Sequence, residues 1–192
     1  MNREDVFRTE IRYIKNARLM DNAKKMIQLL PEYFFEIPAS STGKYHPSFA
    51  LGEGGLVRHT KVAVRLAKEL LDNECIGNVF TSDEKDMIIM SLIMHDGCKS
   101  GLTKGEYTVA NHPSIVATLI KNNADKLTLE ESELKLICEM IEAHMGPFNK
   151  DYRGNTILPL PANKYQKFVH MCDLLASKKF LDVKFNNNEI VE

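Results

Sequence analysis

The stretch SDEKDMIIMSLIMHDG, residues 82–97, decides the fold. Ser82 is predicted to cap the start of a helix, where Asp83 and Glu84 favour the positive first turn. The helix then runs through Met87–Met94, where nearly every side chain is apolar. Because a helix that is apolar on all sides must be covered by other elements, we predict that it forms the buried centre of the domain.

Apolar residues recur at helical spacing on both sides of this stretch, in residues 4–30, 56–70, 113–120, 128–146 and 161–180. Pro31 is predicted to end the first of these helices, while Pro113 and Pro161 suit the first position of theirs. Thr128 and Glu131 have the spacing of a capping box. The pattern therefore predicts six helices joined by polar loops.

Few segments compete with the helical interpretation. Residues 36–55 are rich in Pro, Ser and Gly and are predicted to form a loop. Strand-like alternation is confined to residues 105–109. The fold class predicted from these patterns is all-α.

Composition limits the class of protein. The 192 residues carry a net charge of −1 and 44% hydrophobic residues, as expected of one folded domain. The balanced charge argues against a dedicated binder of long nucleic acid, and the apolar stretches are too short to span a membrane. The start MNREDVFRTE lacks the apolar core of a signal peptide, and the four cysteines show no CxxC pair. We therefore expect a cytoplasmic protein with reduced thiols.

Polar residues that can bind a metal lie at the ends of these apolar helices or, in the case of Asp173, mid-way along the last helix. Such positions allow ligands to converge while the helices pack around them. Imidazole and carboxylate groups together suit first-row transition metals. Asp96 has two carboxylate oxygens and can bridge two ions about 3.5–4 Å apart. The six candidate ligands are His59, His95, Asp96, His112, His144 and Asp173.

The same residues also have a structural interpretation. His95–Asp96 can form a helix cap, and the other histidines can hydrogen-bond backbone groups at helix ends. However, an unpaired aspartate directly after so apolar a helix would be costly to bury, which favours a metal ligand at Asp96. His46 is expected to be exposed in its loop, and His170, one turn before Asp173, can support that ligand.

The candidate ligands, in this order, resemble the HD-domain metal-dependent phosphohydrolases, and most closely the H…HD…H…H…D branch, which holds two metal ions. The motifs that carry the resemblance are GGLVRHT (54–60), MHDGCKSG (94–101), EAHMG (142–146) and CDLLASKKF (172–180). The GGL-x-x-H opening and the D-x-x-A-S ending look similar to HD domains of bacterial exoribonuclease and phage origin. The resemblance covers roughly residues 54–180 and implies a single-domain HD-type helical bundle. The corresponding division is an N-terminal helix and loop (1–53), an HD domain (54–185) and a C-terminal tail (186–192).

The resemblance also implies roles for individual residues. The first ion would be held by His59, His95, Asp96 and Asp173, and Asp96 would bridge to a second ion completed by His112 and His144. Asp96 and Lys99 are then the catalytic residues, since Lys99 matches the lysine that often follows the HD pair. Arg58, Lys99 and Lys150 are the expected phosphate contacts. With Lys104 and Arg153, the loop cations are predicted to form a basic mouth.

The function predicted on this basis is hydrolysis of a phosphoester or pyrophosphate bond in a nucleotide or short oligonucleotide by a metal-activated hydroxide. The cofactors are two divalent transition-metal ions, with Fe, Mn, Co, Ni and Zn left open. The partner is a small phosphorylated substrate; a membrane is excluded, a long nucleic acid is not expected, and homo-oligomers stay open. One alternative is a non-catalytic HD domain that binds a nucleotide or protein in regulation. Another is a structural metal site, although those are usually closed sets of four Cys or His ligands.

Overall fold

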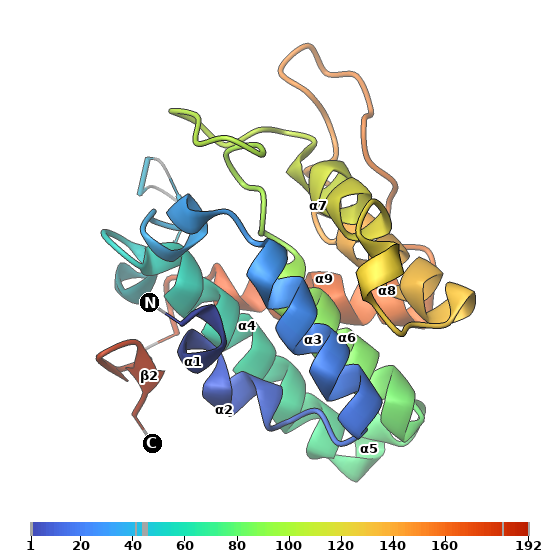
Figure 1. The fold of residues 1–192 in the computed structure, drawn as a ribbon. Coiled ribbons are helices and arrows are strands. Elements are labelled where there is room, and N and C mark those ends of the chain that lie inside the picture. The colour runs from blue at the N-terminus through green and yellow to red at the C-terminus, as the bar shows by residue number, and fades with distance from the viewer. Residues whose placement is uncertain (1, 41, 44–45, 182, 192) are drawn as a thin grey trace.

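Helix α6 (Ser82–Met94) lies at the centre of a helical bundle, as predicted (Figure 1). The computed structural model describes residues 2–40, 42–43, 46–181 and 183–191. Every residue of α6 from Asp86 to Met94 is buried, and the hydroxyl of Ser91 donates to the carbonyl of Met87 at 2.8 Å. Only the cap differs from expectation. Thr81, rather than Ser82, caps α6 in a capping box with Glu84.

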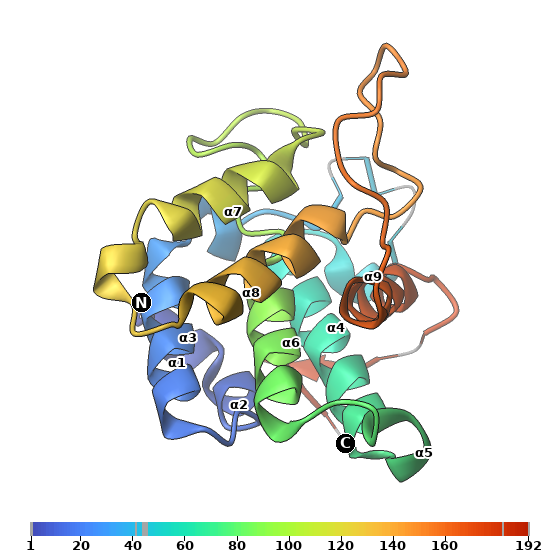
Figure 2. The ribbon, with the colours of Figure 1, turned by 90° about the vertical axis from the view of Figure 1, so that its right-hand side faces the viewer.

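Four helices cover α6, namely α3 (Ala17–Leu29), α4 (Gly55–Asp72), α8 (Glu131–Ala143) and α9 (Lys164–Ala176). Helices α3, α6 and α4 run side by side, while α8 and α9 cross them (Figure 2). Helix α7 (His112–Lys121) packs on α8 and α3. The fold is thus the all-α bundle that the periodicity predicts.

The N-terminal segment forms three helices instead of the single one predicted. They are α1 (Arg3–Val6), α2 (Arg8–Ile11) and α3. The chain breaks before α3 because Asn16 is extended and its side chain accepts from the first backbone N–H groups of that helix. Leu30 is extended before Pro31, so the first helical segment ends where it was predicted to end.

The predicted capping box before α8 is shifted by two residues. Glu130 and Glu133 form it, whereas Thr128 and Glu131 do not. The backbone N–H and side-chain hydroxyl of Thr128 instead bond to the Asn22 side chain on α3 at 2.8 and 2.9 Å. This tertiary contact outweighs the local capping pattern.

The last helix is shorter than predicted. Asn163 caps α9 and forms a capping box with Gln166. The helix therefore begins at Lys164 and not at Pro161. It ends at Ala176, and Phe180 lies beyond it with 77% of its surface exposed. The helical spacing of Phe180 therefore did not place it in the core.

The predicted strand at residues 105–109 is wrong, because these residues lie in a loop without regular secondary structure. The strands of the described chain are β1 (Phe185–Asn186) and β2 (Glu189–Ile190), an antiparallel hairpin. The remaining short elements are α5 (Glu74–Gly77) and the 3₁₀ turns Glu32–Phe35, Ser48–Ala50 and Ala124–Lys126. All four cysteines are free thiols.

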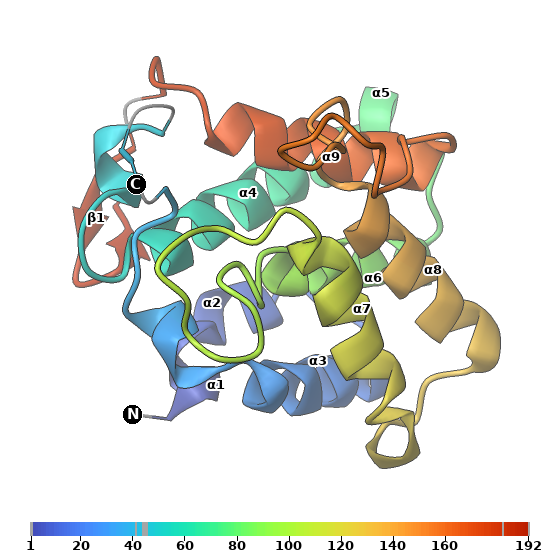
Figure 3. The same ribbon diagram turned by 90° about the horizontal axis from the view of Figure 1, so that it is seen from above.

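Two long loops project from the same end of the bundle. The α6–α7 loop (97–111) and the α8–α9 loop (145–163) stand above the helices in Figures 1 and 2. Seen from above, they lie over the region where α4, α6, α7 and α9 approach one another (Figure 3). In the described part of the chain, no helix is both long and apolar enough to cross a bilayer.

Candidate metal centre

The centre is built around His95 and Asp96, which directly follow the buried helix α6. His95 caps α6, and the chain then turns with hydrogen bonds from Gly97 to Met94 and from Lys99 to Asp96. A Cβ atom at Gly97 would lie 2.6 Å from the Leu30 side chain, so only glycine fits this turn without a shift. The apolar helix thus positions two polar residues in the protein interior, where both are fully or almost fully buried.

Three histidines are oriented in the same way by their own backbone. The Nδ1 atoms of His95, His112 and His144 lie 2.6–2.8 Å from the carbonyl oxygens three residues earlier. Because a carbonyl can only accept, each Nδ1 carries the proton and donates it. In the neutral imidazole, each Nε2 atom then has a free lone pair, which is the form in which histidine binds a metal.

The two carboxylate oxygens of Asp96 face different histidines. Oδ1 lies 2.9 Å from Nε2 of His112 and 3.6 Å from Nε2 of His144. Oδ2 lies 3.5 Å from Nε2 of His95 and 3.7 Å from Nε2 of His59, and it also accepts from Lys99. Asp96 therefore stands between two halves of one cluster.

Asp173 on α9 completes the half that contains His59. Its Oδ1 lies 2.9 Å from Nε2 of His59 and 3.4 Å from Nε2 of His95. The Nε2 atoms of the two histidines are themselves 3.4 Å apart. The structure thus brings together all six residues that the sequence analysis selected, from α4, α6, α7, α8 and α9.

The surroundings keep both carboxylates ionised. Burial alone would raise the pKa of Asp96, but Lys99 and His95 hold it well below 3.8. Burial would likewise raise the pKa of Asp173, but hydrogen bonds from His59 and His95 hold it well below 3.8. Two negative oxygen donors are therefore present at neutral pH.

Burial acts in the opposite direction on the histidines. It lowers the pKa of His112, although Asp96 opposes the shift, and this favours the neutral imidazole that metals bind. Burial would also lower the pKa of His95, but Asp96 and Asp173 outweigh it and raise the value. The excess negative charge that attracts a proton to His95 is the charge that a bound cation would neutralise.

Several polar atoms of the cluster lack a hydrogen-bond partner among the described residues. They are Nδ1 of His59, Oδ1 of Asp96, and Nε2 of His112 and of His144, all inaccessible to solvent. The Asp96 oxygen and the His112 nitrogen are 2.9 Å apart but not aligned as a hydrogen bond. Unpaired buried polar atoms are costly, so this donor set fits a divalent cation. Two overlapping groups have the spacing of metal ligands, His59–His95–Asp173 and His95–Asp96–His144.

Two further histidines contact the cluster. His170 was expected to support Asp173 but bonds to His144 instead, and the expectation that His46 is exposed is wrong, because its ring is half-buried against His59. The His46 ring meets the His59 ring edge-on with centroids 5.1 Å apart, and burial beside His59 lowers the pKa of His46 to about 4. His170 bonds through Nδ1 to the carbonyl of His144 at 2.6 Å. Gly146 has φ +55°, and a Cβ atom there would lie 2.2 Å from the His170 ring. His46 is brought in by a loop, which no periodicity could have revealed.

The expected phosphate contacts differ in their placement. Lys99 lies at the cluster, with its side chain 11% exposed and its ammonium on Asp96. Arg58 has its guanidinium bonded to the carbonyls of Phe49, Leu51 and Glu53 and to Asn188, so it holds the neighbouring loop instead of facing the cluster.

The remaining cations of the predicted basic mouth lie in the long loops. Lys150 is exposed in the α8–α9 loop, where its backbone pairs with Thr156. Lys104 lies 3.5 Å from Glu36. A cleft of about 480 Å³ opens beside Lys99 and is lined also by Ile37, Gly52, Lys104 and Tyr107. This cleft connects solvent with the lysine that contacts Asp96.

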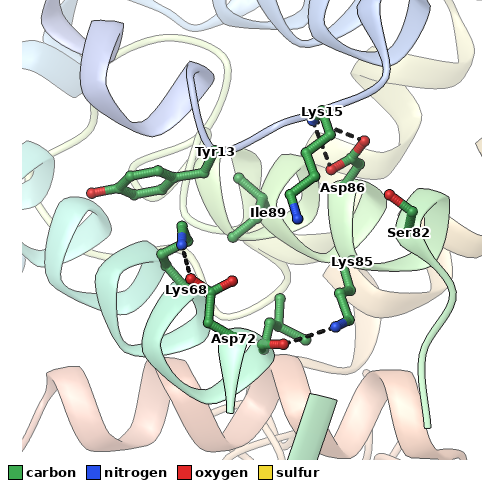
Figure 4. A pocket seen from close by; sticks show the side chains of 9 residues that line it. Tyr13, Lys15, Lys68, Asp72, Ser82, Lys85, Asp86 and Ile89 are labelled. Carbon is green, nitrogen blue, oxygen red and sulfur yellow. Dashed lines mark hydrogen bonds and ion pairs between the residues drawn. The ribbon is translucent and has the colours of Figure 1, made fainter. Parts of the chain in front are cut away.

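A second pocket, at the opposite end of α6, has a different character (Figure 4). It holds only about 20 Å³, and four of its charged side chains bond to each other or to backbone groups. Lys68 pairs with Asp72, Lys85 donates to the carbonyl of Leu71, and Asp86 accepts from the backbone of Lys15. The contact of Asp86 fastens the segment before α3 to α6, and that of Lys85 fastens α6 to α4.

Comparison with known proteins finds relatives by sequence but no matching family model or solved structure. No family model matches the chain, and no solved structure matches it. The chain is 26% identical to proteins named 3′-5′ exoribonuclease YhaM from Listeria monocytogenes and from Listeria welshimeri. Each alignment covers 95% of this chain but 57% of the relative, so the chain spans little more than half of the curated relatives' length.

The name of these relatives is at odds with the expectation that a long nucleic acid is an unlikely partner. The chain is therefore similar to bacterial proteins named as exoribonucleases, and it carries a buried histidine–aspartate cluster with the spacing of metal ligands.

Proposed function

We propose that this chain is a metal-dependent phosphohydrolase that cleaves a phosphoester bond at the end of a nucleic acid or in a nucleotide. The observation that carries the proposal is the position of Asp96, whose two oxygens face separate sets of histidine nitrogens. A single structural ion would need only one such set. A carboxylate shared between two sets is the arrangement that two-ion hydrolysis requires.

The proposed ligands are the six residues of the cluster. His59, His95, Asp96 and Asp173 would hold one ion, and Asp96, His112 and His144 the other. The unpaired buried atoms support this assignment, because ions at these positions would give Asp96 Oδ1 and the two Nε2 atoms their missing partners. Divalent ions there supply a water activated near neutral pH and neutralise charge that develops on the phosphate.

Lys99 and the burial of the site are the protein's own proposed contributions to the reaction. Lys99 contributes a fixed positive charge at the inner end of the cleft, where a phosphate oxygen would meet it in place of Asp96. The low exposure of the cluster strengthens this attraction, because little water competes for it. Lys150, exposed on the neighbouring loop, is proposed as an outer contact with phosphate.

The relatives favour one substrate class within this proposal. They are named as 3′-5′ exoribonucleases, so the 3′ end of an RNA strand is the preferred candidate and single nucleotides come second. The overall charge of −1 does not oppose this, because an exonuclease needs only local contacts near the strand end.

Metal reconstitution tests the proposal directly. The protein is stripped with a chelator, dialysed, and supplied separately with Mn²⁺, Fe²⁺, Co²⁺, Ni²⁺ or Zn²⁺. Release of mononucleotides from a short RNA, and of phosphate from a panel of nucleotides, is then measured. We expect turnover with at least one metal and none in the stripped protein. Tight binding of RNA or nucleotide without turnover under any metal would instead support a regulatory binding domain.

A further inference from the structure

Exposed aromatic side chains gather in the two loops beside the metal centre. The described chain has four strongly exposed aromatic side chains, and three of them lie in these loops. Tyr107 in the α6–α7 loop and Phe148 in the α8–α9 loop are each 65% exposed, and Tyr152 is 89% exposed. Both loops project from the same end of the bundle (Figures 1 and 2). Packing inside this chain does not explain the rings.

The tip of the α8–α9 loop is a built turn. Lys150 and Thr156 form a β-bridge across its base, and the backbone N–H of Asp151 donates to the carbonyl of Asn155 at 2.9 Å. The carboxylate of Asp151 accepts from the backbone of Arg153 and Asn155 at 2.9 and 2.8 Å. The acidic side chain is thus used within the turn, and Tyr152 is presented at its tip.

Positive charge accompanies these rings. The Arg153 guanidinium lies 5.2 Å from the centre of the Tyr152 ring, and the side chain of Lys150 is exposed nearby in the chain. In the other loop, Tyr107 shares the cleft with Lys99 and Lys104. Each loop therefore combines a flat aromatic face with side chains that attract phosphate.

Aromatic faces interleaved with Lys and Arg are the features that bind unpaired bases and the backbone of a single strand. A duplex offers no such stacking, because its bases are already stacked on each other. We infer that Tyr107, Phe148 and Tyr152, with Lys150 and Arg153, form a surface that holds single-stranded nucleic acid and directs its end to the metal centre. That the strand end is directed to the metal centre rests on the proposed function. That the surface binds a single strand does not.

Binding without metal separates the two proposals. The affinity for a 5′-fluorescein 12-mer of oligouridylate is measured by anisotropy in EDTA. We expect Phe148→Ala with Tyr152→Ala to raise Kd about 10-fold or more, whereas Tyr152→Phe, which keeps the ring, retains affinity. Val79→Ala is the control, since Val79 is 55% exposed and follows α5 by two residues in the sequence, and α5 lies at the other end of the bundle from the loops (Figure 1). Lys150→Ala should lower the slope of log Kd against log salt by about 0.7, and Lys135→Ala on α8 should not.

Activity and oligomeric state complete the test. In the metal-loaded protein, the aromatic double variant should lose more activity on the 12-mer than on a dinucleotide. Loss of 12-mer binding in these variants, with no turnover in the metal-loaded parent, would overturn the proposed function but support the surface. Unchanged 12-mer binding would overturn the surface. A shift from dimer to monomer in sedimentation, without loss of RNA binding, would overturn it as well and identify the rings as a contact between copies.

Discussion

Helix α4 buries charge in two ways within three residues. Lys61 has an ammonium 3.1 Å from Glu10 and 2.8 Å from Glu189, and it is fully buried. His59, two positions earlier, is equally buried. Its Nε2 atom faces the candidate metal centre, and its Nδ1 atom has no hydrogen-bond partner among the described residues. The charge at Lys61 is thus balanced by protein groups from both ends of the chain, while the region around His59 is left incomplete.

The contrast shows how a structural cluster and a binding cluster differ. At Lys61, the carboxylates present are enough to pair the buried cation. Around Asp96, an oxygen and two imidazole nitrogens lack partners, although folding could have supplied hydroxyl or amide groups to pair them. A buried site that stays unsatisfied in the folded chain indicates a partner from outside, and its donors suit a divalent metal.

The largest effect is expected from Asp96→Asn, which removes the negative charge shared by the two halves. We expect hydrolysis to fall by about 10³-fold or more, because the two proposed ions would lose their shared ligand. The metal content, measured by elemental analysis, should fall with it, while circular dichroism stays that of a helical protein. Asp86→Asn, in the pocket at the other end of α6, serves as the control. Full activity in Asp96→Asn would contradict the shared-ligand assignment.

The second prediction concerns Lys61→Met, which leaves Glu10 buried without its cation. The free energy of unfolding should fall by about 3–5 kcal/mol, and adding Glu10→Gln should recover much of it. Burial raises the pKa of Glu10, and Lys61 opposes that shift in the parent protein. In Lys61→Met, the carboxylate of Glu10 therefore binds a proton at higher pH in the folded state than in the unfolded state. Stability of this variant should rise as pH falls from 7 toward 4.5, as urea unfolding at several pH values can check.

Metal itself should stabilise the fold by a smaller amount. An ion at 100 times its dissociation constant adds about 2.7 kcal/mol if it binds only the folded state. Thermal unfolding in excess Mn²⁺ or Co²⁺ should therefore give a higher Tm than in EDTA. The same rise in Tm is expected in Lys61→Met, because the ion pairs of Lys61 with Glu10 and Glu189 are separate from the proposed metal ligands. Identical Tm values with chelator and with every metal would argue against a metal site.

The smallest effect is expected from His170→Ala. His170 donates to the His144 carbonyl and holds the backbone that carries this proposed ligand. Metal affinity, followed by competition with a coloured chelator, should weaken about 10-fold while the fold persists. His170→Asn offers a shorter donor and should recover part of the loss. No change in either variant would show that His144 is positioned without His170.

The sequence was sufficient for those features that depend on local pattern. The apolar run Met87–Met94 identified the central helix, and the six candidate ligand residues do lie close together. Details fixed by tertiary contact were missed. Thr128 bonds to Asn22 instead of capping its own helix, and the nearness of His46 to His59 depends on how a loop folds back. Arg58 adjoins His59 in sequence, but successive helical residues point about 100° apart, so its guanidinium binds loop carbonyls instead.

The contact between Gly146 and His170 has an evolutionary consequence. The imidazole fills the space that a side chain at position 146 would need, and the backbone there has φ +55°. Position 146 is therefore not free to change while histidine occupies position 170. Among descendants of a common ancestor, we expect any residue other than glycine at 146 to be accompanied by a smaller residue at 170.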